Sequence, residues 1–196
     1  MNSRMIYVVG PSGAGKDTLL SWLKSRVRTS SLLHWARRTI DRPPSADSNA
    51  EQHESMDSIG FENLLKEGAF AMYWEANSHR YGIRFQEIAP LYQFKWVIVN
   101  GSRGYLPKAA SQYPGMTILH ITADQELLRK RLIDRGRESN QLIEERLRRE
   151  VPIICPPGSS LIEIINNGSL ESVGSLLLQR LGELESTILI ADPFPS

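Results

Sequence analysis

The stretch GPSGAGKD, Gly10 to Asp17, decides how this chain is expected to fold. It follows the apolar run MIYVV (residues 5–9) and precedes a segment whose apolar residues recur at helical spacing. A buried strand, a glycine-rich turn and a helix, in that order, are the context of a phosphate-binding P-loop, G-x-x-x-x-G-K-[ST]. The stretch matches through Lys16 and departs at Asp17, where a hydroxyl would help to hold Mg²⁺.

Such a loop binds phosphate because glycines let backbone N–H groups turn inward, and the following helix adds its positive N-terminal end. Lys16 supplies a mobile cation for the β and γ phosphates. Asp17 can reach Mg²⁺ with its carboxylate, since this ion prefers hard oxygen ligands. We therefore expect ATP and Mg²⁺ to be bound here, by Gly10, Pro11, Ser12, Gly13, Ala14, Gly15, Lys16, Asp17 and Thr18.

Composition limits the function classes. The chain has 196 residues, 41% of them hydrophobic and 23% charged, which suits one soluble domain. A net charge of +1 speaks against a broad nucleic-acid-binding surface. No apolar run is long enough for a signal peptide or a membrane span, and the one cysteine, Cys155, fits a reducing compartment. We expect a cytoplasmic protein that binds small molecules, with no nucleic-acid or membrane partner; a homodimer stays open.

Strand-like apolar runs alternate with helical segments, which indicates a parallel α/β sheet. Beyond the first strand, strands are expected at 31–36, 69–76, 95–100, 116–122 and 161–168. Helices are expected at 58–68, 84–94, 104–113, 124–136, 138–150 and 169–185. The polar, proline-rich residues 37–55 are expected to form a loop or small lobe, and residues 78–83 a turn.

An arginine-rich stretch, LRKRLIDRGRESNQLIEERLRR (residues 128–149), surrounds a helix–glycine–helix break. Phosphoryl transfer needs positioning and neutralisation of the moving group, and arginines on a hinged lid supply both while excluding water. For any single arginine the alternative is a solvated helix with Arg–Glu pairs at i,i+4 spacing.

Four segments, GPSGAGKD, RTIDRP, GAFAMYWEANSHRYGI and RLIDRGRES…ERL, resemble the guanylate-kinase superfamily in order and spacing, over roughly residues 7–170. The resemblance implies one three-layer P-loop domain over 1–196, with an acceptor-binding lobe near 37–84 and a helical lid near 124–150. It implies that Lys16, Arg135 and Arg146 are catalytic and that Arg42 and Tyr81 bind the acceptor phosphate.

The departures from guanylate kinases lie on the base side of the site. Met72 replaces the glutamate that hydrogen-bonds guanine, Ile83 replaces a serine or threonine near the base, and Glu54 falls near a phosphate-binding tyrosine. A site that reads a base needs polar partners, because unpaired buried groups are costly. The pocket therefore suits an acceptor that carries phosphate but no purine.

One branch of the superfamily resembles this chain in GPSGAGKD, aspartate included, and in VIVNGSRGYLP. That branch implies transfer of the ATP γ-phosphoryl group to the 1-phosphate of ribose 1,5-bisphosphate in phosphonate breakdown, which yields 5-phospho-α-D-ribose 1-diphosphate (PRPP). Asn100 ends a buried strand where many P-loop proteins have aspartate, so Asp17 is hypothesised to supply the missing carboxylate. The acceptor's second phosphate needs a further anchor: Arg103 is preferred, because it follows that strand, over Arg37, Arg38, Arg80 and Lys108.

Two alternatives stay open on the sequence alone. The first is a guanylate or other nucleoside monophosphate kinase, against which Met72 and Ile83 speak. The second is a non-catalytic guanylate-kinase-like binding module, against which the intact Gly15 and Lys16 speak. The acceptor oxygen is already anionic near neutral pH, so no general base is expected. The four histidines, His34, His53, His79 and His120, are each expected to be structural; the alternative, contact with a substrate, concerns only His53 and His79.

Overall fold

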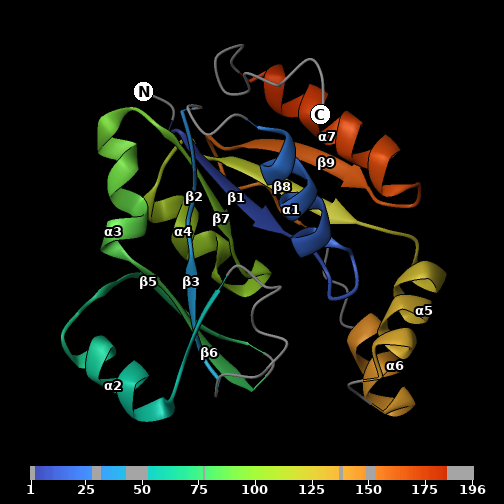
Figure 1. Ribbon diagram of the computed structural model, residues 1–196, viewed down its shortest axis with the longest axis horizontal. Coiled ribbons are helices and arrows are strands. Elements are labelled where there is room, and N and C mark those ends of the chain that lie inside the picture. Colours follow the sequence, from blue (N-terminus) through green and yellow to red (C-terminus); the bar gives the residue numbers. More distant parts are fainter. Residues whose placement is uncertain are drawn as a thin grey trace.

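The computed structural model describes residues 3–27, 32–42, 53–76, 78–136, 139–148 and 153–184. Its larger sheet has five parallel strands in the order β2-β7-β1-β8-β9 (Figure 1). The strands are β1 (Met5–Val9), β2 (Leu33–Trp35), β7 (Trp96–Asn100), β8 (Thr117–Thr122) and β9 (Ser160–Ile165). Every residue of β1 is buried, as expected for a central parallel strand covered on both faces. The predicted parallel α/β sheet is confirmed.

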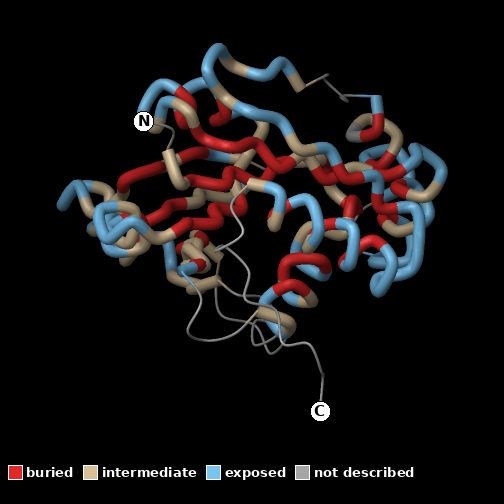
Figure 2. Tube along the Cα trace, turned by 90° about the horizontal axis from the view of Figure 1, so that it is seen from above, coloured by how far each residue is buried: buried red, intermediate tan, exposed pale blue. Residues whose placement is uncertain are grey.

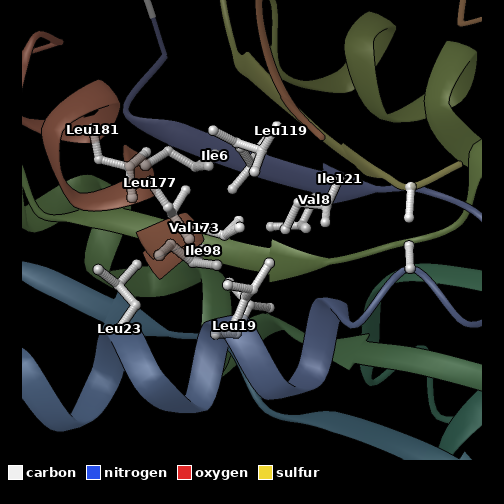
Figure 3. Packing of buried hydrophobic residues seen from close by; sticks show 14 of the residues in the cluster. Ile6, Val8, Leu19, Leu23, Ile98, Leu119, Ile121, Val173, Leu177 and Leu181 are labelled. Atoms are coloured by element: carbon white, nitrogen blue, oxygen red, sulfur yellow. The ribbon is translucent and has the colours of Figure 1, made fainter. Parts of the chain in front are cut away.

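One face of this sheet packs against α1 (Lys16–Arg26) and α7 (Leu170–Gly182), and Leu128 and Leu132 of α5 (Gln125–Arg135) join the same apolar cluster. Ile6 and Val8 of β1 point to this face, where they join Leu19 of α1 and Leu177 of α7 (Figure 3). Alternation along the strand explains the arrangement, because successive side chains point to opposite faces.

The other face of the parallel sheet is covered by α4 (Leu106–Gln112) and by the second sheet. Tyr7 and Val99 point this way and pack with Ala109 of α4 and Met72 of the second sheet. Figure 2 shows buried segments, coloured red, through the middle of the molecule and exposed segments around them. These layers confirm the three-layer fold predicted from the sequence.

The second sheet has four strands in the order β4-β3-β6-β5: β3 (Arg38–Asp41), β4 (His53–Met56), β5 (Phe70–Ala76) and β6 (His79–Arg84). Strand β6 pairs antiparallel with both β3 and β5, and β3 pairs parallel with β4. The expected turn at 78–83 is therefore wrong, and the loop expected at 37–55 contains two strands. Strand β6 was not predicted because it contains polar residues such as His79 and Arg80. It forms a strand because it pairs with β3 and β5, not because its own sequence is hydrophobic.

Register gives the second sheet two distinct faces. Arg38 lies opposite Ile83 and Ile40 opposite Tyr81, so these side chains share the face toward the parallel sheet. Thr39 lies opposite Gly82 on the outer face, where α2 (Ser58–Lys66) packs; there the ring of Phe61 stacks on Phe70 at 4.8 Å between centroids. The acceptor lobe at 37–84 stays a prediction as a functional unit.

Two short elements, α3 (Phe85–Ile88) and η2 (Ala89–Gln93), lead into β7, as expected for a helix disturbed by proline. After β8, the chain forms α5 and α6 (Asn140–Arg148), which lie side by side (Figure 1). Gly136 ends α5 with a left-handed φ of 61°, the usual helix stop. Arg129 of α5 bonds Glu144 of α6 at 2.8 Å. The predicted helix–glycine–helix break is confirmed; the lid function of 124–150 stays a prediction.

Candidate active site

The P-loop connects the end of β1 to the start of α1 and packs closely against Ile121 and Asn166. A Cβ atom at Gly10 would lie 1.9 Å from the carbonyl oxygen of Ile121, and one at Gly15 would lie 2.5 Å from Asn166. Gly13 and Gly15 both adopt positive φ, 85° and 80°. Gly15 is the N-cap of α1 and makes no side-chain cap, so the first helical N–H groups are available to an anion.

Two residues not selected from the sequence hold the loop from the side of β9 and α5. Asn166, which follows β9 and is buried, donates a hydrogen bond of 2.8 Å to the Ala14 carbonyl. Arg131 of α5 donates to the Asn166 carbonyl at 3.0 Å and to the Gly13 carbonyl at 3.4 Å. Burial lowers the pKa of Arg131, and the nearby Arg135 lowers it further. No sequence pattern pointed to these contacts, because they join segments far apart in the chain.

Lys16 lies over the loop, where its Nζ donates to the carbonyls of Gly10 and Pro11, both at 2.9 Å. Burial of the ammonium lowers the pKa of Lys16 to about 8. Asp17 opposes this shift, whereas the positive charges of Arg38, Arg103 and Arg135 add to it. Four cationic side chains thus gather around one loop beside one carboxylate. A bound polyphosphate would supply the negative charge that this cluster lacks.

Asp17, the unusual residue of the motif, joins three elements. Its Oδ1 accepts a hydrogen bond of 2.6 Å from the Asn100 amide at the end of β7. The same oxygen accepts a bond of 3.1 Å from the Arg38 guanidinium of β3. Asn100 is buried, and its Oδ1 has no hydrogen-bond partner in the described part of the chain. The geometry therefore brings together Asp17 and Asn100, which the sequence paired only as a hypothesis.

Arg103 begins η3 (Arg103–Tyr105), just after β7. The preceding loop rests on Tyr7, whose hydroxyl donates to the Ser102 carbonyl at 3.2 Å and accepts from the Ser102 N–H at 3.1 Å. Burial raises the pKa of Tyr7 well above its usual range, so the phenol stays neutral. A Cβ atom at Gly101 would lie 2.1 Å from the Tyr7 ring, which explains the glycine. Tyr7 thus holds the backbone of Ser102, a contact that the sequence did not predict.

The second sheet places the expected acceptor residues on its inner face. Tyr81 stacks on Trp74 with ring centroids 5.6 Å apart and an angle of 4°. Arg42 follows β3, and its guanidinium nitrogen lies 3.4 Å from His53 Nε2, which also lies 3.0 Å from the Ser55 hydroxyl. His79 lies next to the carbonyl oxygen of Asp41 at 3.1 Å.

Met72 and Ile83, which stand where guanylate kinases read the base, are fully buried. Both belong to the apolar cluster between the two sheets. Neither side chain carries a group that could hydrogen-bond a purine. Glu54 lies on the outer face, where it accepts from the Thr39 hydroxyl at 3.0 Å and pairs with Arg84 at 2.7 Å.

The structure separates the five cations considered as second anchors. Arg80 is held on the outer face by Asp41 and Glu62, each at 2.7 Å. The other two peripheral cations also have partners, since Arg37 lies 4.0 Å from Glu54 and Lys108 lies over the Tyr105 ring. Arg38 and Arg103 are the two that lie near Lys16.

Of the two arginines expected in the lid, Arg135 and Arg146, the structure describes the side chain of Arg135. Arg135 is exposed on α5 and close enough to depress the pKa of Lys16. The side chain of Arg146 lies outside the described residues. Thr18 is exposed in the first turn of α1.

No cluster of three or more potential ligands among His, Cys, Asp and Glu occurs in the described part of the chain. That is compatible with Mg²⁺, which usually takes one or two protein carboxylates and completes its shell with phosphates and water. Among the described helices, none is long and apolar enough to cross a membrane.

No protein-family model matches the chain. A ribose 1,5-bisphosphate phosphokinase from Burkholderia mallei is 38% identical over 91% of this chain and 95% of its own length. One from Pseudomonas paraeruginosa is 38% identical over 93% of this chain and 97% of its own length. A longer relative of the same name, from Janthinobacterium, is also 38% identical over 92% of this chain. The matched region covers 39% of the length of that relative.

Two solved structures share the fold at low sequence identity. A guanylate kinase from Anaplasma phagocytophilum superposes with a TM-score of 0.58 at 12% identity, covering 95% of this chain and 89% of its own. A sugar kinase from Janibacter superposes with a TM-score of 0.51 at 19% identity, covering 91% of this chain and 94% of its own. These likenesses show that the chain shares the fold of these two kinases.

Proposed function

Because the chain belongs to the ribose 1,5-bisphosphate phosphokinase family, we propose that it transfers the γ-phosphoryl group of ATP to the 1-phosphate of ribose 1,5-bisphosphate. The products are ADP and 5-phospho-α-D-ribose 1-diphosphate, within phosphonate catabolism. The observation that carries the proposal is the meeting of Lys16 and Asp17, from the nucleotide side, with Arg38 and Arg103 at one place. The proposal includes a cytoplasmic location and no nucleic-acid or membrane partner; assembly as a homodimer stays open.

The P-loop residues suit a Mg²⁺–ATP complex. Gly10 to Thr18 would surround the phosphates with backbone N–H groups, and Lys16 would leave the loop carbonyls for the β and γ phosphates. Asp17 would hold Mg²⁺ directly or through a water, and the orphan Oδ1 of Asn100 is a fitting acceptor for such a water. When bound, Mg²⁺ screens the negative charge of the phosphates.

The reaction asks the protein for position and charge neutralisation rather than for a general base. The attacking group is a phosphate oxygen of the acceptor, which is anionic near neutral pH. It forms a bond to the γ-phosphorus while the bond from that phosphorus to the ADP oxygen breaks. In our proposal Lys16, Arg135 and Arg146 neutralise the moving group, while Arg42, Tyr81, Asn100 and Arg103 hold the acceptor.

The apolar Met72 and Ile83 support a sugar phosphate over GMP as the acceptor. Both lie inside the core cluster, so a guanine edge would find no hydrogen-bond partner from them. An unpaired base edge costs about 1–3 kcal/mol for each lost hydrogen bond. A nucleoside monophosphate kinase activity is therefore the weaker candidate, and the complete P-loop speaks against a non-catalytic module.

Phosphorus NMR tests the proposed reaction directly. The protein with Mg²⁺, ATP and ribose 1,5-bisphosphate should convert the 1-phosphate signal into the two coupled signals of a diphosphate, with ADP formed in equal amount. ATP consumption without that diphosphate would refute the proposal.

The role of Asp17 is tested with Asp17→Ala, which removes every oxygen ligand at this position, beside the control Glu67→Ala on an exposed residue that follows α2. Asp17→Ala should raise the Mg²⁺ concentration needed for half-maximal activity by about tenfold, the loss expected for one carboxylate–cation interaction. The control should leave this concentration unchanged. Full Mg²⁺-dependent activity of Asp17→Ala would count against the metal role.

A further inference from the structure

We propose that Arg38 binds the acceptor phosphate and that Asp17 is the residue that positions it. The inference rests on the proposed function and assigns one further substrate-binding residue to that site. It departs from the preference for Arg103 alone, because the structure places Arg38 between the P-loop and the second sheet.

Arg38 spans the two halves of the site. It is the first residue of β3 in the second sheet, whereas Asp17 lies in the first turn of α1, beside the phosphate loop. One guanidinium nitrogen of Arg38 bonds Asp17 Oδ1 at 3.1 Å. Arg38 lies opposite the fully buried Ile83, which fixes its side chain on the inner face of its sheet. A phosphate held by Arg38 is thus held beside the nucleotide.

The ion pair between Arg38 and Asp17 contributes little to the stability of the fold. The Asp17 side chain is 53% exposed, and ion pairs with such solvent access contribute about 0–1 kcal/mol to stability. Within the described residues, the guanidinium of Arg38 makes only this hydrogen bond. A guanidinium has five N–H donors in a planar fork that fits a phosphate. The remaining donors are therefore suited to a ligand.

The charge around Lys16 points the same way. Arg38 bonds Asp17, the residue that directly follows Lys16, at 3.1 Å, so two positively charged side chains lie beside the same phosphate loop. Such a gathering is unfavourable until anions enter it. The γ-phosphate and the acceptor phosphate must approach each other in the reaction, and a cation that reaches both reduces their repulsion. Arg38 is placed to be that cation.

Asp17 can position Arg38 and still serve a metal ion. Its Oδ1 receives both the Arg38 bond and the 2.6 Å bond from Asn100. Within the described residues, its second oxygen makes no hydrogen bond. One carboxylate oxygen thus fixes the arginine while the other stays available to Mg²⁺.

Arg37 provides the matched control for Arg38. It is the preceding residue, but it lies 4.0 Å from Glu54 on the outer face of the sheet, and its side chain is 55% exposed. Removing its charge changes the net charge of the protein by the same amount as removing that of Arg38. Any difference between the two variants therefore reports position rather than charge.

The experiment measures binding and turnover separately in wild type, Arg38→Gln, Arg38→Lys and Arg37→Gln. Arg38→Gln should weaken the calorimetric affinity for ribose 1,5-bisphosphate by about 10- to 100-fold, the loss expected for hydrogen bonds between charged groups. Its ADP affinity should stay within about twofold, because the P-loop contacts are unchanged. Arg38→Lys should recover part of the loss, since a lysine restores the charge without the fork. Arg37→Gln should match wild type.

Asp17→Asn separates the positioning role from the metal role. In the absence of Mg²⁺ and nucleotide, it should still weaken binding of ribose 1,5-bisphosphate, because Arg38 is no longer fixed by a carboxylate. A residue that only held the metal would leave this metal-free affinity unchanged. Unchanged metal-free affinity in Asp17→Asn would overturn the positioning role.

An unchanged acceptor affinity in Arg38→Gln, with or without a lower melting temperature, would overturn the assignment of Arg38. Failure of the wild type to phosphorylate ribose 1,5-bisphosphate would instead refute the proposed function. In that case, inorganic phosphate binding to the ADP-loaded protein decides the Arg38 assignment: it should weaken in Arg38→Gln, and equal binding in both proteins would overturn the assignment.

Discussion

Nucleotide binding to this protein should depend on pH through Lys16. In the free protein, burial lowers the pKa of Lys16 to about 8. Bound phosphates add negative charge beside the ammonium, so the pKa in the complex must be higher than in the free protein. The protonated form therefore binds nucleotide more tightly. The contribution of Lys16 to binding is complete below pH 8 and is lost as the pH rises toward the pKa of the complex.

The size of the effect follows from that pKa of about 8. Lys16 is about 90% protonated at pH 7 and about 10% protonated at pH 9. If only the protonated form binds tightly, the apparent affinity falls by about tenfold over this interval. At pH 8 the protein should take up about half a proton for each nucleotide bound.

Calorimetric titration with ADP, repeated in buffers of different ionisation enthalpy, gives both the affinity and the proton uptake. Phosphate groups titrate near pH 6, so they are largely ionised across the interval and change the result little. The variant Lys16→Met should bind weakly, with no change in affinity between pH 7 and pH 9. Equal wild-type affinity at the two pH values, together with no proton uptake at pH 8, would refute the reasoning.

Three further predictions concern residues around the site. Gly10→Ala should lower the ADP affinity measured by calorimetry by about 100-fold or more, because the alanine Cβ would lie 1.9 Å from the Ile121 carbonyl oxygen and must displace the loop. Retained affinity would show that the loop tolerates the shift. Tyr7→Phe should lower the free energy of unfolding in urea by about 1–3 kcal/mol, because both hydrogen bonds to Ser102 are lost. The same variant should raise the KM for the acceptor, and an unchanged KM would mean that Tyr7 does not position the Arg103 loop. Arg80→Ala should lower the free energy of unfolding in urea by about 1–3 kcal/mol, because Asp41 and Glu62 lose their partner. Its kcat and KM should stay within about twofold of wild type, and a large kinetic effect would place Arg80 in the site.

The sequence was sufficient for the parallel sheet and the phosphate loop. In both cases the determining interactions are local or uniform along a segment. The run MIYVV is apolar throughout because both faces of β1 are covered, and the loop's own backbone path requires glycine at Gly13 and Gly15, which adopt positive φ.

The second sheet was harder to predict, because its strands carry polar side chains. Strand β6 begins with His79 and Arg80. It is stabilised by pairing with β5, which directly precedes it, and with β3, which is distant in the chain. Periodicity in a short, half-exposed strand is weak against such long-range pairing.

The contacts that organise the site were also beyond sequence reasoning. Arg38 and Asp17 are 21 residues apart, and Arg131 reaches a carbonyl 118 residues away. The motif identified Asp17 as unusual, but only the fold shows that one carboxylate joins β3, β7 and α1. Sequence patterns identify residue types, whereas these pairings depend on how the two sheets meet.

The measurement that tests the central claim most directly is the ratio of kcat/KM for ribose 1,5-bisphosphate to kcat/KM for GMP, with ATP and Mg²⁺ held constant. Phosphate-binding groups combined with the buried, apolar Met72 and Ile83 predict a ratio of at least about 1,000, since a site without partners for a base discriminates strongly against it. A ratio below one would contradict the account, because the pocket would then read guanine through groups other than those assigned.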